Sequence, residues 1–266
     1  MKNFVRTEER EIPYIFEKSS VAICRGSYIL THGLGTSKNE YLDFYRKLSI
    51  ALQAQGFNVL RFDFAGHGDS AESGRLFNLT RCFYETAVMA KYLCSELALD
   101  ERLNFFGTSF GAGPAVFAAA LFGSKTERVT LLAPAIQYRD LYIDPTTEAR
   151  KSRYEGFLSA SLFAGGTVEV DQCVKLQWQN AIEFATIDLN LQITSIADRL
   201  SVIHGTADEA IPIDLVRLLV EQVRGARFIE RPGMEHGYTV LGDETGNSPE
   251  SLANFEAIVL EACRAY

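Results

Sequence analysis

Gly107-Thr-Ser-Phe-Gly111 is the stretch on which the interpretation of the rest of the chain depends. The residues before it, 102–106, predict a short buried strand, and the small residues at 111–122 predict a helix after it. Ser109 should then lie on a sharp strand-to-helix turn whose flanks leave room only for glycine. Backbone N–H groups at the start of that helix would favour a negative charge developing near the Ser109 hydroxyl. Alone the G-x-S-x-G pattern is weak evidence, because a glycine-rich turn with a helix-capping serine looks the same.

Length and composition limit the protein class. The 266 residues suit one large α/β domain or a core with an insertion, and 47% hydrophobic with 23% charged residues is ordinary for a globular protein. A balance of 26 basic and 34 acidic residues gives a net charge of −8, which argues against nucleic acid or an anionic membrane surface as a partner. No apolar run approaches the ~20 residues of a membrane span. Residues 1–11 also lack the apolar region of a secretory signal.

Cysteine usage indicates the compartment. The five cysteines contain no C-x-x-C pair and stand at positions 24, 82, 94, 173 and 263. This scatter is typical of buried thiols in a reducing compartment rather than of a disulfide framework or a zinc site. We therefore expect a cytoplasmic protein without a metal site.

Strand-like and helix-like stretches alternate along most of the chain. Strands are predicted at residues 12–17, 21–24, 27–31, 58–62, 102–106, 128–133, 200–204 and 226–230. Helices are predicted at residues 40–55, 80–97, 111–122, 212–223 and 249–264. This alternation predicts an α/β fold with a mostly parallel sheet that is covered by helices on both faces. Functional residues are then expected on loops at the carboxyl ends of the strands.

The alternation is interrupted at residues 136–195. Within this stretch, segments 161–164 and 167–170 flank two glycines and predict a hairpin, which a helix at 171–184 would follow. We expect residues 1–135 and 196–266 to form the core and 136–195 to form an inserted cap. Apolar cap residues could make a wall for an acyl or aryl group, or could simply be the core of the cap: Phe157, Leu158, Leu162, Phe163 and Trp178.

A serine hydroxyl becomes a good nucleophile only when a base removes its proton and a carboxylate orients that base. The chain has four histidines. His32 opens a His-Gly-Leu-Gly turn that it is expected to shape. His67 lies in a tight Gly-His-Gly turn, where it is expected to shape the loop, and His204 lies within a predicted strand, where it is expected to be buried packing. His236 lies on a glycine-flanked loop after the last predicted strand, where a general base is expected. The alternative for His236 is a solvent-facing loop histidine.

The acid is expected after a strand, between the serine and the histidine in sequence. Asp208 meets both conditions. Its competitors are the adjacent Glu209 and, further away, Asp188 and Asp198. Acyl transfer also needs two N–H donors for the oxyanion, which we expect from the backbone of Phe110, directly after the nucleophile, and of Leu34, on the loop after the strand at 27–31.

Together these stretches resemble the α/β-hydrolase superfamily, closest to the serine hydrolases that include cinnamoyl and feruloyl esterases and monoacylglycerol-lipase-like enzymes. The resemblance covers about residues 27 to 240 and rests on His32-Gly33, 61–70, 107–111, 131–134, 204–208 and His236. It implies an eight-stranded, mostly parallel sheet with a cap after the sixth strand. Many relatives carry histidine before the nucleophile and two glycines after it, where this chain has Thr108 and Phe110-Gly111-Ala112. We expect Phe110 to narrow the site beside the oxyanion hole.

The sequence thus favours a serine hydrolase that cleaves an ester of a small acyl or aryl acid, with Ser109, His236 and Asp208 as its catalytic residues. This mechanism needs no metal or organic cofactor, and the partner would be a small-molecule ester or thioester. The main alternative is a thioesterase or acyltransferase acting on a CoA- or carrier-bound acyl group. Four cations could meet its phosphates unless they form a solvated face: Arg139, Arg150, Lys151 and Arg153. Cleavage of a C–C or peptide bond also stays open, as does a protein that only binds a ligand, because a fold does not fix a reaction.

Overall fold

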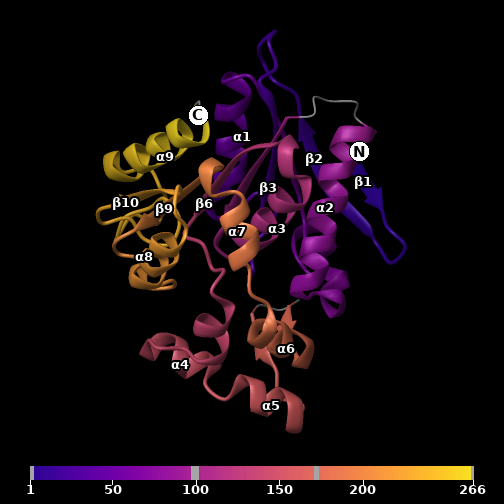
Figure 1. Ribbon diagram of the computed structural model, residues 1–266, viewed down its shortest axis with the longest axis vertical. Helices are drawn as coiled ribbons and strands as arrows, with labels where there is room; N and C mark the ends of the chain where they lie inside the picture. Colours follow the sequence, from indigo (N-terminus) through magenta and orange to yellow (C-terminus); the bar gives the residue numbers. More distant parts are fainter. Residues whose placement is uncertain (1–2, 97–101, 171–173, 265–266) are drawn as a thin grey trace.

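The computed structural model describes residues 3–96, 102–170 and 174–264. Its centre is an eight-stranded sheet with the strand order β1-β2-β4-β3-β5-β6-β9-β10 (Figure 1). These strands are β1 (Asn3–Arg6), β2 (Glu11–Glu17), β3 (Gly26–Thr31), β4 (Phe57–Phe62), β5 (Leu103–Thr108), β6 (Thr126–Leu132), β9 (Leu200–Gly205) and β10 (Arg227–Arg231). β1 and β2 pair antiparallel, as do β2 and β4, whereas all other neighbours pair in parallel. The predicted α/β fold with its mostly parallel, eight-stranded sheet is confirmed.

The central strands are buried along their whole length. Every residue of β3, β4, β5 and β9 is buried. Parallel strands covered on both faces have continuous apolar runs rather than alternation. These strands were therefore recognisable in the sequence.

Helices cover both faces of the sheet (Figure 1). α1 (Phe44–Ala54) and α9 (Pro249–Ala262) share one hydrophobic core with residues such as Leu30 and Phe106. The other face carries a larger core, to which α2 (Leu79–Ser95), α3 (Ala112–Phe122), α7 (Asn190–Ser195) and α8 (Ile213–Gln222) contribute.

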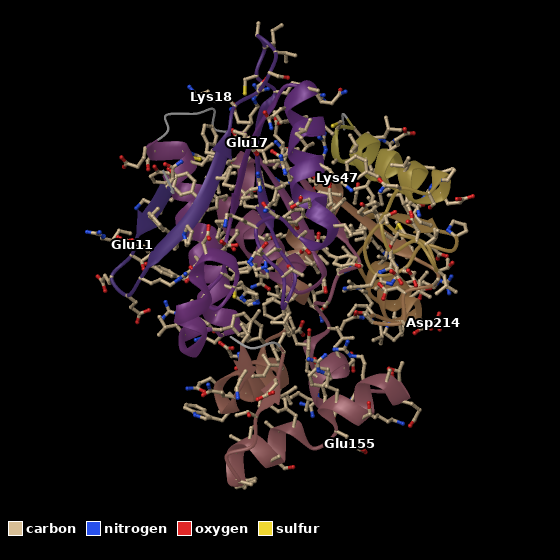
Figure 2. All side chains as sticks on the ribbon, turned by 180° about the vertical axis from the view of Figure 1, so that it is seen from behind. Glu11, Glu17, Lys18, Lys47, Glu155 and Asp214 are labelled. Atoms are coloured by element: carbon tan, nitrogen blue, oxygen red, sulfur yellow. The ribbon has the colours of Figure 1, made fainter. Side chains whose placement is uncertain are left out.

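Between β6 and β9 the chain leaves the sheet at the carboxyl ends of the parallel strands. It forms α4 (Glu148–Tyr154), α5 (Phe157–Phe163), a small ribbon of β7 (Val168–Glu169) and β8 (Lys175–Leu176), and α6 (Trp178–Thr186). Figure 2 labels Glu155 in this insertion and Lys18 at the opposite end of the molecule. We propose residues 136–195 as the cap, although α7 at its end packs against α3 of the core.

The first edge of the sheet differs from the prediction in two respects: one predicted strand is absent, and one strand was not predicted. Residues 21–24 form no strand, and Val21 and Ile23 are exposed. The antiparallel partner of β2 is instead β1. β1 is a short edge strand with mostly exposed residues, so no apolar pattern marked it in the sequence.

The predicted hairpin in the insertion is wrong. Residues 161–163 end α5 as helix, and β7 pairs with β8 rather than with the preceding segment. The predicted helix at 171–184 is α6, which begins only at Trp178 because Gln177 and Asn180 form a capping box there. Residues 171–173 lie outside the described residues.

Two further expectations concern thiols and the membrane. Cys24, Cys82, Cys94 and Cys263 form no disulfide, and Cys173 lies outside the described residues. Across the described ranges, no helix combines the length and the apolar character that crossing a membrane requires.

Candidate active site

Ser109 lies on the turn between β5 and α3, where the pentapeptide predicts it. Its backbone φ is 52°, in the left-handed region that serine seldom adopts. A Cβ atom at Gly107 would lie 2.7 Å from the Cα of Ala112, and one at Gly111 would lie 2.0 Å from the carbonyl oxygen of Thr31. Only glycine fits at either flank, and this packing fixes the Ser109 hydroxyl at the start of α3.

His236 contacts both other predicted residues. It lies on the loop between β10 and α9, and its Nε2 is 3.0 Å from Oγ of Ser109. Its Nδ1 is 2.8 Å from Oδ2 of Asp208, on the loop after β9. With the proton on Nδ1, the ring donates to the carboxylate while Nε2 accepts from the hydroxyl. The His236 side chain is 34% exposed, so a small molecule can reach it.

The Asp208 carboxylate is buried and fixed by its own loop. Its Oδ1 accepts the N–H groups of Ala210 at 2.9 Å and Ile211 at 2.8 Å, which leaves Oδ2 for His236. The adjacent Glu209 is exposed. The more distant competitors, Asp188 and Asp198, are also exposed and bond only to residues beside them in sequence.

His204 packs beneath this acid. It is fully buried in β9, its Nε2 donates to the carbonyl of Ile211 at 3.0 Å, and the same atom lies 3.6 Å from Oδ2 of Asp208. Burial lowers the pKa of His204, and the nearby Asp208 charge only partly offsets this. A neutral imidazole therefore supports the Asp208 loop from below, in keeping with the packing role expected for it.

The charges around His236 favour its protonated form. Burial lowers its pKa, but the hydrogen bond that the ring donates to Asp208 and the charges of Asp208 and Glu40 outweigh burial, and the charge of Arg150 opposes them weakly. The net result is a pKa above the ordinary 6.5. A base of this kind can take a proton from a serine hydroxyl near neutral pH.

The loops after β3 and β4 are held together by side chains. Nε2 of His32 accepts the N–H of Phe64, and Nε2 of His67 accepts a backbone N–H of the first loop, each at 3.0 Å. Nζ of Lys38 lies 2.5 Å from Oδ2 of Asp63, and the Lys38 N–H donates to Oδ1 at 2.7 Å. The segment at 61–70 thus fixes the loop after β3, and His32 and His67 have the loop-shaping roles expected of them.

The two amides expected as oxyanion donors flank Ser109. Leu34 lies on the loop after β3, and among the described residues its N–H has no acceptor. A Cβ atom at the neighbouring Gly33 would lie 3.4 Å from the Cβ of Ser109, so this loop passes close to the hydroxyl. Phe110 follows Ser109 in the short helical turn Ser109–Gly111 that leads into α3. Both amides can therefore approach an oxygen atom bound beside Ser109.

A cavity of about 310 Å³ opens beside Ser109 and His236. Its other walls come from the loop after β3, the start of α1 and the His236 loop, and include Leu34, Glu40, Tyr41, Phe44 and Tyr238. Lys47 of α1, labelled in Figure 2, donates to the hydroxyl of Tyr238 at 2.8 Å and steadies that wall.

Glu40 is the charged residue of this cavity that sequence reasoning missed. No motif marks it, and the sequence placed it only at the start of a helix. Its position depends on a turn with positive φ angles that no residue pattern indicated.

The sequence pattern of the α/β hydrolase fold family matches residues 29–172, which is more than half of the chain. The chain belongs to this family. Est1E from Butyrivibrio proteoclasticus is similar in structure, with 16% identity, a TM-score of 0.72 and 98% of each chain covered. The Paleococcus ferrophilus monoacylglycerol lipase has 20% identity and a TM-score of 0.66, over 96% of this chain and 99% of the lipase. At these identities the likeness shows the fold alone. No curated protein matches in sequence.

In this α/β hydrolase the three predicted substrate-binding residues do not reach Ser109. None of them lines the cavity beside it. Phe157 is 3% exposed and belongs to the hydrophobic core, whereas Phe163 is 88% exposed at the end of α5. Trp178 is half exposed at the start of α6. Only their apolar character can be read from the sequence, because their places depend on how α5 and α6 dock.

Phe110 fills space between the nucleophile turn and the cap. It is 1% exposed, and its ring centroid lies 5.5 Å from that of Phe77, 6.2 Å from Tyr138 and 6.3 Å from Phe184 of α6. Phe110 does not line the cavity beside Ser109, so the narrowing of the site expected from it stays a prediction. The open cavity lies on the Glu40 side.

The cap cations of this hydrolase are largely engaged. Arg139 pairs with Asp144 at 2.8 Å, Lys151 pairs with Glu148 at 3.0 Å, and Arg153 donates to a backbone carbonyl. Arg150 is different, because its guanidinium donates to carbonyls of the cap and of the Asp208 loop. Among the described residues, no cluster of three or more His, Cys, Asp or Glu side chains could hold a metal ion.

Proposed function

We propose that this α/β hydrolase is a serine hydrolase that cleaves carboxylic esters of a small acyl or aryl acid. One observation carries the proposal: a continuous hydrogen-bonded chain runs from buried Asp208 through His236 to Ser109, on a turn that strains Ser109 into the left-handed region. Backbone strain of this kind clusters at active sites. The expected order of nucleophile, acid and base along the chain agrees with this arrangement.

The proposed reaction has two halves. Oγ of Ser109 attacks the ester carbonyl while Nε2 of His236 takes its proton, and the Leu34 and Phe110 amides stabilise the oxyanion. Collapse of this intermediate breaks the bond to the alcohol, which leaves with the proton from His236. Water, activated by the same base, then releases the acid from Ser109. Asp208 keeps the Nδ1 tautomer throughout.

The cavity supports a small substrate. Its volume of about 310 Å³ is at the lower end of the ligand pockets found in proteins. Leu34, Tyr41, Phe44 and Tyr238 give it apolar walls, which suit an aryl or short acyl group. The likeness to Est1E, a structure of which contains bound ferulic acid, agrees with an aryl acid without establishing one.

A fluorophosphonate probe tests the mechanism without knowledge of the substrate. We expect it to label the protein at Ser109 and to leave Ser109→Ala unlabelled. In Ser109→Ala, kcat on any ester that the protein turns over should fall on the order of 10⁶-fold, while circular dichroism shows an unchanged fold. Labelling of Ser109→Ala, or activity that survives the substitution, would overturn the mechanism.

A substrate panel then tests the class. We expect p-nitrophenyl acetate, butyrate and an aryl ester to be hydrolysed much faster than acetyl-CoA or longer acyl-CoA, since all four cations of the proposed cap are already engaged by protein groups. Faster turnover of acyl-CoA would instead favour the thioesterase or acyltransferase alternative.

A further inference from the structure

Glu40 is held at the site by an unusual backbone. Its φ and ψ are 60° and 173°, a region that is almost reserved for glycine. Leu42 and Asp43 follow with φ values of 54° and 56°. Glu40 therefore begins a turn of three strained residues within four positions. Such strain persists where the surrounding structure forces it, and it accumulates at functional sites.

The carboxylate of Glu40 is directed back toward the nucleophile loop. One oxygen, Oε1, accepts the N–H of Gly33 at 2.5 Å, and Oε2 accepts the N–H of Tyr41 at 3.2 Å. Lys38, on the same loop, is engaged by Asp63 and Asp69 instead. Within the described part of the chain, no lysine or arginine pairs with Glu40.

Glu40 shares the cavity with both reacting groups. It lines the same 310 Å³ space as Ser109 and His236. A Cβ atom at Gly33 would lie 3.3 Å from Oε1 of Glu40 and 3.4 Å from Cβ of Ser109, so Gly33 separates the carboxylate from the nucleophile by little more than its own width. The next amide along the chain is that of Leu34, the expected oxyanion donor.

We propose that Glu40 is a positioning residue of this active site: it fixes the Gly33–Leu34 peptide over Ser109, and its charge stabilises the imidazolium that His236 becomes when it takes the serine proton. The inference rests on the proposed function. Asp208 acts on the Nδ1 side of the ring, whereas Glu40 acts across the cavity.

Four charged or titratable groups face His236. They are Asp208 and His204 from the region of β9, Glu40 from the loop after β3, and Arg150 from α4. Burial raises the pKa of Glu40, and hydrogen bonds from Gly33 and Tyr41 together with the His236 charge counter this rise. Tyr45, which is buried beneath, has a pKa raised first by burial and then by the Glu40 charge.

Two substitutions separate the two parts of the role. Glu40→Gln keeps an oxygen for the Gly33 amide but removes the charge. Glu40→Gly removes both and suits the strained φ, so it should fold even if other replacements do not. Asp43→Asn is the matched control, because Asp43 lies in the same turn, is half exposed, stands outside the cavity wall and pairs only with Arg46 at 3.8 Å.

The experiment measures the rate of fluorophosphonate labelling from pH 5 to 9. In this reaction the Oγ–P bond forms, fluoride leaves and the serine proton passes to His236, so the rate follows the neutral imidazole. Loss of the Glu40 charge should lower the pKa of His236, so in Glu40→Gln the fall in labelling rate on the acid side should move to lower pH by on the order of one unit. High salt should reduce this difference between the variant and the wild type. Asp43→Asn should follow the wild type.

Glu40→Gly should show the same shift and in addition lose about 10²-fold in the rate at high pH, as for loss of an ordered oxyanion donor. A merely structural Glu40 would leave the position of the acid limb unchanged in both variants, and that result would overturn the inference. A wild-type protein that takes up no probe would overturn the proposed function instead, so the two failures are distinguishable.

Discussion

Ser109 shows how one residue governs its surroundings. Its strained φ places the hydroxyl in the open, and the close approach of neighbouring backbone to Gly107 and Gly111 is the cause of that strain. The two glycines were visible in the sequence, and the physical need for them made the turn predictable. Asp208 was visible by its position after a strand, although the sequence left Glu209 open.

The choice between these two acids can be tested directly. Asp208→Asn should lower kcat by about 10⁴-fold, because an amide at this position favours the wrong tautomer of His236. Glu209→Gln should lose less than about tenfold, since an exposed carboxylate contributes little. Steady-state kinetics on both folded variants gives the answer. If Glu209→Gln loses activity while Asp208→Asn stays active, the catalytic acid is Glu209 rather than Asp208.

The pH dependence follows from His236. Its imidazole must be neutral to accept a proton, and its pKa is raised above 6.5 because Asp208 and Glu40 outweigh the effect of burial. The value of kcat/KM on an uncharged ester should therefore be full at high pH and fall about tenfold per unit below a pKa that exceeds 6.5. A profile from pH 5 to 9 measures it. A flat profile between pH 5 and 8 would argue against His236 as the base.

At the scale of elements, the loops after β3 and β4 act as one unit. Asp63 is fully buried and stabilises this unit: its carboxylate pairs with the Lys38 ammonium and accepts the backbone N–H groups of Lys38 and Asp69. The loop that carries Leu34 and Glu40 therefore owes its place to Asp63, which directly follows β4 and lies 25 positions beyond Lys38 in the sequence. A site can thus fail without any change in the residues that touch substrate.

Asp63→Ala tests this support. It leaves the Lys38 ammonium largely buried with only the partly exposed Asp69 as a partner, so the free energy of unfolding should fall by about 3 kcal/mol. Glu148→Ala, which removes an exposed partner of Lys151, is the control and should change it by less than about 1 kcal/mol. Urea denaturation followed by circular dichroism compares the two. Equal, small changes would mean that Asp63 does not hold the loops.

The elements that the sequence missed share a physical cause. β3 and β5 were predictable because both of their faces are buried. β1 is an exposed edge strand, and α5 ends in apolar residues that resembled a hairpin strand. Glu40 depends on tertiary contacts that impose positive φ angles, so the local sequence carries no signal for it. Patterns of burial can be predicted from sequence, whereas strained turns and the docking of an insertion cannot.

At the scale of the whole molecule, two of the hydrogen-bonded junctions between the proposed cap and the core act on different parts of the core. Glu183 of α6 accepts the N–H groups of Leu79 and Thr80 at the start of α2, at 2.7 and 2.9 Å. Arg150 of α4 donates to the carbonyl of Ala210 on the Asp208 loop at 2.7 Å. The junction between α6 and α2 is distant in sequence from the proposed catalytic residues. The junction between Arg150 and Ala210 involves the loop that carries Asp208.

The second junction also brings a positive charge close to His236. Arg150 opposes Asp208 and Glu40, and its influence on the His236 pKa is smaller than that of either carboxylate. Arg150→Met keeps a long apolar stem over the rings of Tyr142 and Tyr154 but removes the charge and the bond to the Asp208 loop. The pKa of His236 should therefore rise, so the acid limb of kcat/KM should move to higher pH, opposite in direction to Glu40→Gln.

We expect a shift of about a few tenths of a pH unit for Arg150→Met, together with a fall of about tenfold in kcat on a minimal acetate ester as the Asp208 loop loosens. Glu183→Gln is the control, because it weakens only the junction at the start of α2, which contributes about 0.5 to 1 kcal/mol to stability. It should leave both kcat and the pH at which kcat/KM falls unchanged. Kinetics from pH 5 to 9 on the three proteins decides between two pictures of the cap. If Arg150→Met and Glu183→Gln have the same effects on the pH profile and on kcat, the charge of Arg150 has no specific effect on His236, and the cap contributes only its packing against the core. If only Arg150→Met moves the limb, the cap contributes a charge to the balance that sets the basicity of His236.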